Sequence, residues 1–141
     1  MKLDFPLLTI VSGAQTGADQ GGLAAGLKLG LTTSGWVPNG RPTAERTRLN
    51  VQDADGTVWF GKTDSDGYHC AFNAAMKMRP SSSPNWHREY PWIENPDASE
   101  LRSWIIANSI QTLNVAGNRE HKSPGIYKLT YDTICKAIEG G

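Results

Sequence analysis

The sequence predicts an α/β protein with a Rossmann-like three-layer sandwich, in which a mainly parallel sheet lies between two layers of helices. Short apolar runs alternate with helical patterns along the whole chain, which is typical of a parallel sheet covered on both faces. The order of strand, glycine-bearing turn and helix occurs twice. Neither an internal repeat nor a linker interrupts the pattern, so we expect residues 1–141 to form a single domain.

The composition narrows the class of protein. A length of 141 residues is typical of one domain. Fourteen basic residues balance 14 acidic ones, which argues against general nucleic-acid binding. No apolar run approaches the roughly 20 residues that span a bilayer, and the N-terminus resembles a first strand and not a signal peptide. Cys70 and Cys135 form no CxxC motif, so we expect reduced thiols in a cytoplasmic protein.

The first three elements are a strand, a helix and a second strand. Residues 7–12 (LLTIVS) form a short apolar run that ends at Gly13, as in a buried parallel strand. An Ala- and Leu-containing pattern over 16–29 predicts a helix that stops at Gly30. Residues 31–34 form a weak second strand.

The middle of the chain begins with a loop. Gly, Pro and Asn residues over 35–42 predict this loop, and Thr43 is a candidate cap for a helix over 44–53. The run GTVWF at 56–60 predicts a strand. Residues 67–78 have a helical composition.

The last part of the chain begins with an expected exposed loop at 80–91. A short strand at 92–94 precedes a helix over 98–109, for which Asp97 and Glu100 form a capping box. The final two elements are a strand at 111–116 and a helix at 125–139, which Ser123 and Pro124 begin.

The first turn, residues 12–22 (SGAQTGADQGG), is a candidate ligand site. Its small residues let the backbone approach a ligand, and the amides of the following helix attract phosphate. Gln15, Thr16 and Asp19 favour this interpretation, because an idle turn does not need three polar side chains together. The alternative is a tight strand-to-helix turn that binds no ligand.

The second turn lies within residues 113–127 (LNVAGNREHKSPGIY). Its polar residues Asn114, Asn118, Arg119 and Glu120 lie at or beyond the end of a strand, at the edge where open parallel sheets bind ligands. We expect both turns to meet there, with two helix N-termini converging on one anion and Arg119 supplying the charge. The alternative is that Arg119 and Glu120 are solvated loop charges.

Two further segments have both a functional and a structural interpretation. Trp36, or alternatively Tyr68, could cover a ring by stacking, with Arg41 near a phosphate, although Trp36 could equally be a packing residue. Arg46 and Asn50, together with Asp53, share one face of their helix at a spacing of three to four residues. They either reach the ligand edge or decorate the surface.

Other chemistries have weaker support in the sequence. The segments DADG and DSDG lack the third acidic position and the glutamate of a calcium loop. The histidines have no metal-like spacing, and the neighbours His69 and Cys70 point apart on a helix. No GxSxG elbow is present. We therefore predict no catalytic residue and no metal site.

Four blocks of the sequence resemble the circularly permuted YpsA branch of the SLOG superfamily, formerly described as molybdenum cofactor carrier-like proteins. They are SGAQTGADQGG, GWVPNGR, ERTRLNVQDADGT and LNVAGNREHKSPGIY, in this order. The resemblance covers roughly residues 8–60 and 98–138. It implies a Rossmann-like fold that assembles into a homodimer or homotetramer. It also implies a pocket for a nucleotide, a nucleotide-derived signal or a pterin-nucleotide ligand of the molybdopterin type.

Two features depart from the family pattern. Only Pro42, Thr43 and Ala44 separate the GWVPNGR loop from the ERT helix, a shorter stretch than relatives usually have. Where relatives carry a Gly-Gly-Thr phosphate turn, this chain reads KTDSDGYHCAF. Asp64 and Asp66 replace the anion cradle, and carboxylates repel phosphate. The phosphate end of the pocket is therefore altered, or residues 67–69 do the same work differently.

The resemblance and the residue patterns together give one expected function. We expect a non-catalytic binding protein that holds a small nucleotide-like ligand at the carboxyl edge of the sheet, as carrier or sensor. The alternatives are a phage-type sponge for a signalling nucleotide and an enzyme like the nucleotide phosphoribohydrolases, whose P-G-G-x-G-T turn is absent here. The resemblance implies that Gly13, Gln15, Thr16, Gly17, Asp19, Gly117, Arg119 and Glu120 contact the ligand. The residue patterns add Trp36, Arg41, Arg46 and Asn50.

Overall fold

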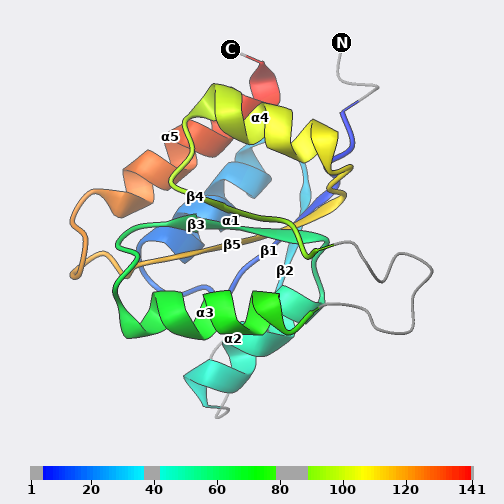
Figure 1. Cartoon of the computed structure of the whole chain (residues 1–141). Coiled ribbons are helices and arrows are strands. Elements are labelled where there is room, and N and C mark those ends of the chain that lie inside the picture. The colour runs from blue at the N-terminus through cyan, green and yellow to red at the C-terminus, as the bar shows by residue number, and fades with distance from the viewer. Residues whose placement is uncertain (1–4, 37–41, 79–88, 141) are drawn as a thin grey trace.

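Five short strands form one sheet in the order β2-β1-β5-β3-β4, and every neighbouring pair is parallel (Figure 1). The computed structural model describes residues 5–36, 42–78 and 89–140. The strands are β1 (Thr9–Val11), β2 (Thr32–Ser34), β3 (Gly56–Phe60), β4 (Trp92–Glu94) and β5 (Thr112–Gly117). The predicted parallel sheet is confirmed, and β5 lies between β1 and β3.

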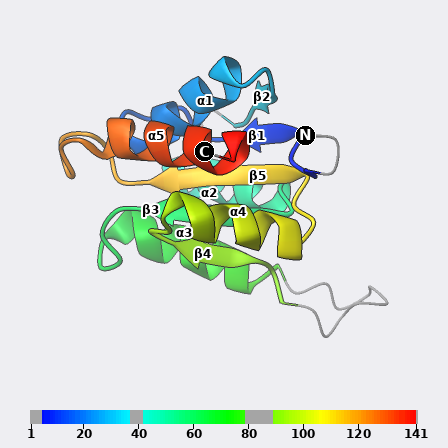
Figure 2. The same ribbon diagram turned by 90° about the horizontal axis from the view of Figure 1, so that it is seen from above.

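Helices cover both faces of this sheet, which confirms the three-layer arrangement (Figures 1 and 2). They are α1 (Ala18–Lys28), α2 (Thr43–Gln52), α3 (Asp66–Met76), α4 (Ala98–Ala107) and α5 (Ile126–Glu139). Helices α1, α4 and α5 pack on one face, and α2 and α3 pack on the other. The chain reverses its direction across the sheet after β2 and again after β4. When all β-α-β crossovers have the same handedness, a reversal of direction places the next helix on the opposite face of the sheet, which gives these two helix layers.

The two faces of the sheet differ in polarity. Side chains of β3 and β5 alternate, so that Val58, Phe60 and Val115 pack into the main apolar core with residues of α4 and α5. Their neighbours Thr57 and Asn114 are also buried, but they point to the opposite face, where Asn114 Nδ2 donates to Thr57 Oγ1 over 3.1 Å. The layer beneath α2 and α3 is therefore partly polar.

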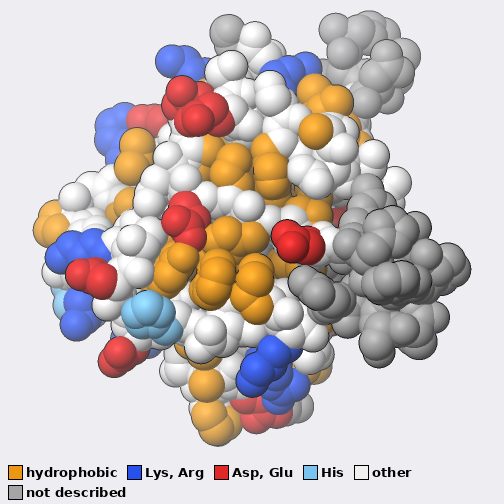
Figure 3. Space-filling model, viewed as in Figure 1, with side chains coloured by type: hydrophobic (Ala, Val, Ile, Leu, Met, Phe, Trp, Pro, Cys, Tyr) orange, Lys and Arg blue, Asp and Glu red, His pale blue; other side chains and the backbone are white. Residues whose placement is uncertain are grey.

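A second, aromatic cluster lies at the β4 edge of the sheet. Trp59 and Tyr68 pack there with the half-buried Phe72 and Trp92, and Figure 3 shows these hydrophobic side chains gathered between α3 and β4. The Tyr68 hydroxyl donates to the Glu94 carboxylate, which also accepts from Trp92 Nε1 at 2.9 Å. Tyr68 is thus held within this cluster, so the suggestion that it covers a ligand ring finds no support.

Several helix ends differ from the sequence-based expectation. Helix α1 begins at Ala18 and not at residue 16, because Ala14 and Gly17 have positive φ angles of 61° and 86° that are incompatible with a helix. Thr43 is the first residue of α2 and not its cap. Ser65 caps α3 by accepting a hydrogen bond from Tyr68 N, a role that the sequence analysis missed.

The predicted capping box of α4 is confirmed. Asp97 Oδ1 accepts from Glu100 N at 2.8 Å, and Glu100 Oε1 accepts from Asp97 N at 2.9 Å. We expect Asp97→Ala to lower the free energy of unfolding by about 1 kcal/mol, because the Glu100 amide in the first turn loses its acceptor. Urea denaturation of the variant measures this, and an unchanged midpoint would contradict it.

Two expected loops lie partly outside the described residues. The stretch 35–42 is described only at 35–36 and 42, so Arg41 lies outside the described part of the chain. The stretch 80–91 is described only at its end. Within the described ranges, no helix has the length and apolar character needed to cross a bilayer.

Candidate functional site: a polar cavity at the carboxyl ends of the strands

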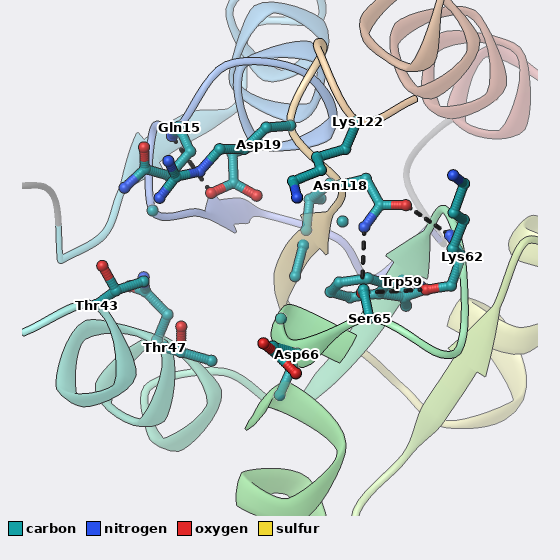
Figure 4. Close-up of a pocket in the computed structure, with 18 of the residues that line it drawn as sticks. Gln15, Asp19, Thr43, Thr47, Trp59, Lys62, Ser65, Asp66, Asn118 and Lys122 are labelled. Carbon is teal, nitrogen blue, oxygen red and sulfur yellow. Dashed lines mark hydrogen bonds between the residues drawn. The ribbon is translucent and has the colours of Figure 1, made fainter. Parts of the chain in front are cut away.

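A cavity of about 530 Å³ opens at the carboxyl ends of β1, β5 and β3, on the side of α2 and α3 (Figure 4). Strand β5 leads to α5 on one face and β3 leads to α3 on the other, so the chain diverges here. In open parallel sheets this divergence creates the usual ligand crevice. The lining residues are Gly13, Gln15, Asp19, Thr43, Arg46, Thr47, Asn50, Trp59, Lys62, Asp64, Ser65, Asp66, Gly67, Ala71, Asn114, Val115, Ala116, Gly117, Asn118, Arg119 and Lys122.

The structure brings most of the predicted site residues together around this cavity. Three come from the first turn and α1, two from α2, and two from the end of β5 and the following loop. They are Gly13, Gln15, Asp19, Arg46, Asn50, Gly117 and Arg119. Their contact with a ligand stays a prediction.

Four predicted residues do not line the cavity. Gly17 packs its backbone against the loop after β5, where a Cβ atom would collide with the Asn118 carbonyl. Thr16 Oγ1 accepts a long hydrogen bond of 3.4 Å from Glu120 N, which joins the two predicted turns. Trp36 is also held within the chain: Asn50 Oδ1 accepts from its backbone N–H at 2.7 Å, and Asp53 Oδ2 accepts from its Nε1 at 2.7 Å.

Asp19 occupies the first turn with its own carboxylate. Oδ2 accepts from Gln15 N at 3.3 Å, and the Gly13 N–H also donates to this carboxylate. Burial raises the pKa of Asp19 to about 7, although these two amides and the nearby Arg119 guanidinium oppose the rise. The Gln15 and Gly13 amides of the turn are therefore hydrogen-bonded to Asp19. The expectation that amides of the following helix attract a ligand anion stays a prediction.

Glu120 does the same at the second turn. Its carboxylate accepts from Gly125 N at 2.7 Å and from Tyr127 N at 3.0 Å, and these hydrogen bonds lower its pKa. The N-terminus of α5 is thus capped by the chain itself, and no α5 residue lines the cavity. The fold therefore does not bring two free helix N-termini to one anion.

This capping role gives a stability prediction. At neutral pH we expect Glu120→Gln to lower the melting temperature, because the ionised carboxylate accepts two amide hydrogen bonds beside a helix N-terminus. Since the folded-state pKa is lowered, this stabilisation is present above the unfolded pKa of glutamic acid and is lost as the pH falls through the folded value. Melting curves over a pH series should show the two proteins converging in acid. A constant difference would contradict this.

Asn118 connects the loops on both sides of the cavity. Its Oδ1 accepts from Lys62 N at 2.6 Å and from Ser123 Oγ at 3.0 Å, and its Nδ2 donates to Ser65 Oγ at 3.3 Å. The side chain is 6 % exposed. Its position beyond the β5 strand was noticed in the sequence. The side chain fixes the loop after β3 relative to the loop after β5.

The segment that replaces the Gly-Gly-Thr turn reaches the cavity. Residues 62 and 64–67 line it, and Figure 4 shows Lys62, Ser65 and Asp66 on this side. Lys62 and Lys122 also line the cavity, and no sequence pattern predicted them there. Their signal was weak, because both are single lysines in polar loops.

The cavity carries mixed charge. Four lining residues are basic (Arg46, Lys62, Arg119 and Lys122) and three are acidic (Asp19, Asp64 and Asp66). The hydroxyls of Thr43 and Thr47 and the amides of Asn50 and Asn114 add neutral hydrogen-bonding groups, and Trp59 supplies an aromatic wall. This donor set suits a ligand that has both an anionic group and a polar body. Among the described residues, no three or more His, Cys, Asp or Glu side chains are grouped to hold a metal ion.

The parallel sheet, its two helix layers and the cavity at the strand ends define a Rossmann-like α/β protein. The model of the circularly permutated YpsA SLOG family matches residues 10–45 and 41–138, and the chain belongs to this family. A crystal structure of a "Putative molybdenum carrier protein" from Syntrophus aciditrophicus SB is similar, with 26 % identity and a TM-score of 0.79. The match covers 94 % of this chain and 95 % of that one. The search of curated proteins found no significant match.

Proposed function

We propose that the chain binds an anionic nucleotide or nucleotide-derived ligand in the cavity at the carboxyl edge of the sheet, as a carrier or sensor. The observation that carries this proposal is the set of four basic residues that line one cavity of about 530 Å³ and come from α2, the loop after β3 and the loop after β5. Arg46 is 8 % exposed, so a phosphate beside it would meet a largely desolvated charge.

Membership of the SLOG family supports a ligand-binding role, and the similar structure is named as a molybdenum carrier. A pterin-nucleotide ligand of the molybdopterin type combines a phosphate with a polar ring, which matches the donor set of the cavity. Plain nucleotides share both features. The carrier and sensor roles therefore share one recognition chemistry, and the identity of the ligand decides between them.

Ligand recovery is the direct test. The purified protein is denatured, and the released small molecules are identified by mass spectrometry. In parallel, the protein is incubated with AMP, GMP and cyclic nucleotides, and bound and free fractions are separated. Recovery of an unchanged phosphorylated ligand supports binding. Release of a free base and ribose phosphate supports the hydrolase alternative, and binding of none of these compounds overturns the proposal.

A paired-variant control assigns the binding to this cavity. Lys62→Gln and Lys122→Gln each remove one cavity charge, whereas Lys128→Gln removes an exposed α5 charge that pairs with Asp132 at 2.7 Å. We expect weaker binding only from the first two variants. Equal effects of all three would point to a general charge effect and not to this site.

A further inference from the structure

We propose that Asp19 is a specificity-determining residue of the cavity, and that an oxoanion binds with the Asp19 carboxyl protonated and donating its O–H to an oxygen of the ligand. The proposal rests on the proposed function, because it concerns the same cavity. The ligand at that end of the cavity is then a fully ionised oxoanion, and its binding is accompanied by the uptake of one proton from water.

Asp19 lies where three walls of the cavity meet. It comes from α1, and its carboxylate closes the turn after β1, so that a Cβ atom at Gly13 would lie 2.9 Å from Asp19 Oδ2 and 3.6 Å from Asn50 Nδ2. Asn50 belongs to α2, and Arg46 lies one turn earlier on the same face of that helix. Figure 4 shows the Asp19 carboxylate reaching into the cavity opposite Thr43 and Thr47.

Charged groups surround Asp19 from each neighbouring element. Arg119, on the loop after β5, attracts the carboxylate directly. Arg46 of α2 and Lys122 of the β5–α5 loop line the same cavity, as do Lys62, Asp64 and Asp66 on the far side. The cations draw an oxoanion to this end, where an ionised Asp19 would repel it at short range.

Protonation removes that conflict without breaking the turn. A protonated carboxyl has one O–H donor and keeps an acceptor oxygen, so it can still accept from Gln15 N while it donates to the ligand. Burial already favours the neutral form of Asp19, since its pKa is raised to about 7. The ligand therefore selects a state that is well populated near neutral pH.

The test uses sulfate as the probe, because sulfate does not titrate in this range, whereas a phosphate monoester does. Affinity is measured from tryptophan fluorescence between about pH 5.5 and 8.5, with Trp59 in the cavity wall as the reporter. For the wild-type chain we expect affinity to fall by up to about tenfold per pH unit above pH 7. Asp19→Asn should bind with little pH dependence, and more tightly than wild type at about pH 8.5.

Two controls separate this proposal from the function on which it rests. His121→Gln replaces the histidine that precedes Lys122 and should leave the wild-type pH profile in place. Calorimetry at about pH 8 in buffers of different ionisation enthalpy should show uptake of close to one proton per sulfate bound.

Sulfate binding that does not depend on pH, or that Asp19→Asn weakens equally at all pH values, overturns the role of Asp19 and leaves the cavity as the site. Failure of sulfate to bind at any pH overturns the oxoanion proposal itself. The nucleotides of the ligand-recovery test then decide separately whether the proposed function stands.

Discussion

Asp19→Asn should stabilise the folded protein in a pH-dependent way, and the effect should be the largest of any single substitution of a charged residue in the cavity. The variant's free energy of unfolding, relative to wild type, should rise by about 4 kcal/mol between about pH 4 and pH 8. Asn is nearly isosteric with Asp and keeps an oxygen that can accept from Gln15 N, so the turn after β1 should persist.

The sign follows from the proton balance. The pKa of Asp19 is raised from 3.8 to about 7 in the folded protein, mainly because its carboxyl is buried. Between these values the folded chain holds a proton that the unfolded chain has released. Stability from this group is therefore fully present below the unfolded pKa and is lost as the pH rises through the folded pKa. The asparagine side chain of the variant has no proton that dissociates in this pH range, so only the wild type loses stability from this group as the pH rises.

Urea denaturation of both proteins over a pH series measures the difference. Comparing the two proteins at each pH cancels the titration of other groups, including Glu120, whose lowered pKa acts in the opposite direction. A difference that stays constant within about 1 kcal/mol from pH 4 to pH 8 would show that Asp19 is not desolvated as the structure places it.

The fold was predictable because local signals and topology agree. The apolar strand β1, the glycine stop at Gly30 and the capping box at Asp97 each correspond to an observed element. Helix starts were less predictable where backbone geometry decides, as at Gly17 and Gly125, whose φ angles are 86° and 92°. A sequence pattern cannot show which glycine adopts a left-handed conformation.

The site was predictable only in part. Both turns could be located at the sheet edge, because each follows a strand. Asp19 and Glu120 accept hydrogen bonds from the amides of the turn and of the helix. This depends on the direction of their side chains, which the spacing of residues in the sequence does not define. The contribution of Lys62 and Lys122 depends on how two loops fold over β5 and β3. Assembly into a homodimer or homotetramer, and contact of Thr16, Gly17, Trp36 and Glu120 with a ligand, stay predictions.

Arg46 should contribute more to ligand affinity than Arg119, although the sequence singled out Arg119 as the source of charge. Both line the cavity, but Arg46 is 8 % exposed whereas Arg119 belongs to the exposed residues. A charge that is already desolvated by the fold interacts strongly with an anion, while an exposed one is screened by water and salt. With GMP as the probe, Arg46→Gln should cost about 2–4 kcal/mol, or roughly 30- to 1000-fold in affinity. Arg119→Ala should cost under about 1 kcal/mol.

Calorimetry with GMP gives both affinities, and thermal melting checks that each variant is folded. Arg48→Gln is a matched control, because Arg48 lies on the same helix, is exposed and does not line the cavity. Arg46→Lys keeps the charge but loses the planar fork that matches a phosphate, so its affinity should fall between those of wild type and Arg46→Gln. A larger loss from Arg119→Ala than from Arg46→Gln, with both variants folded, would place the phosphate at the exposed mouth of the cavity. The phosphate would then bind beside the loop after β5 and not in the desolvated region beneath α2.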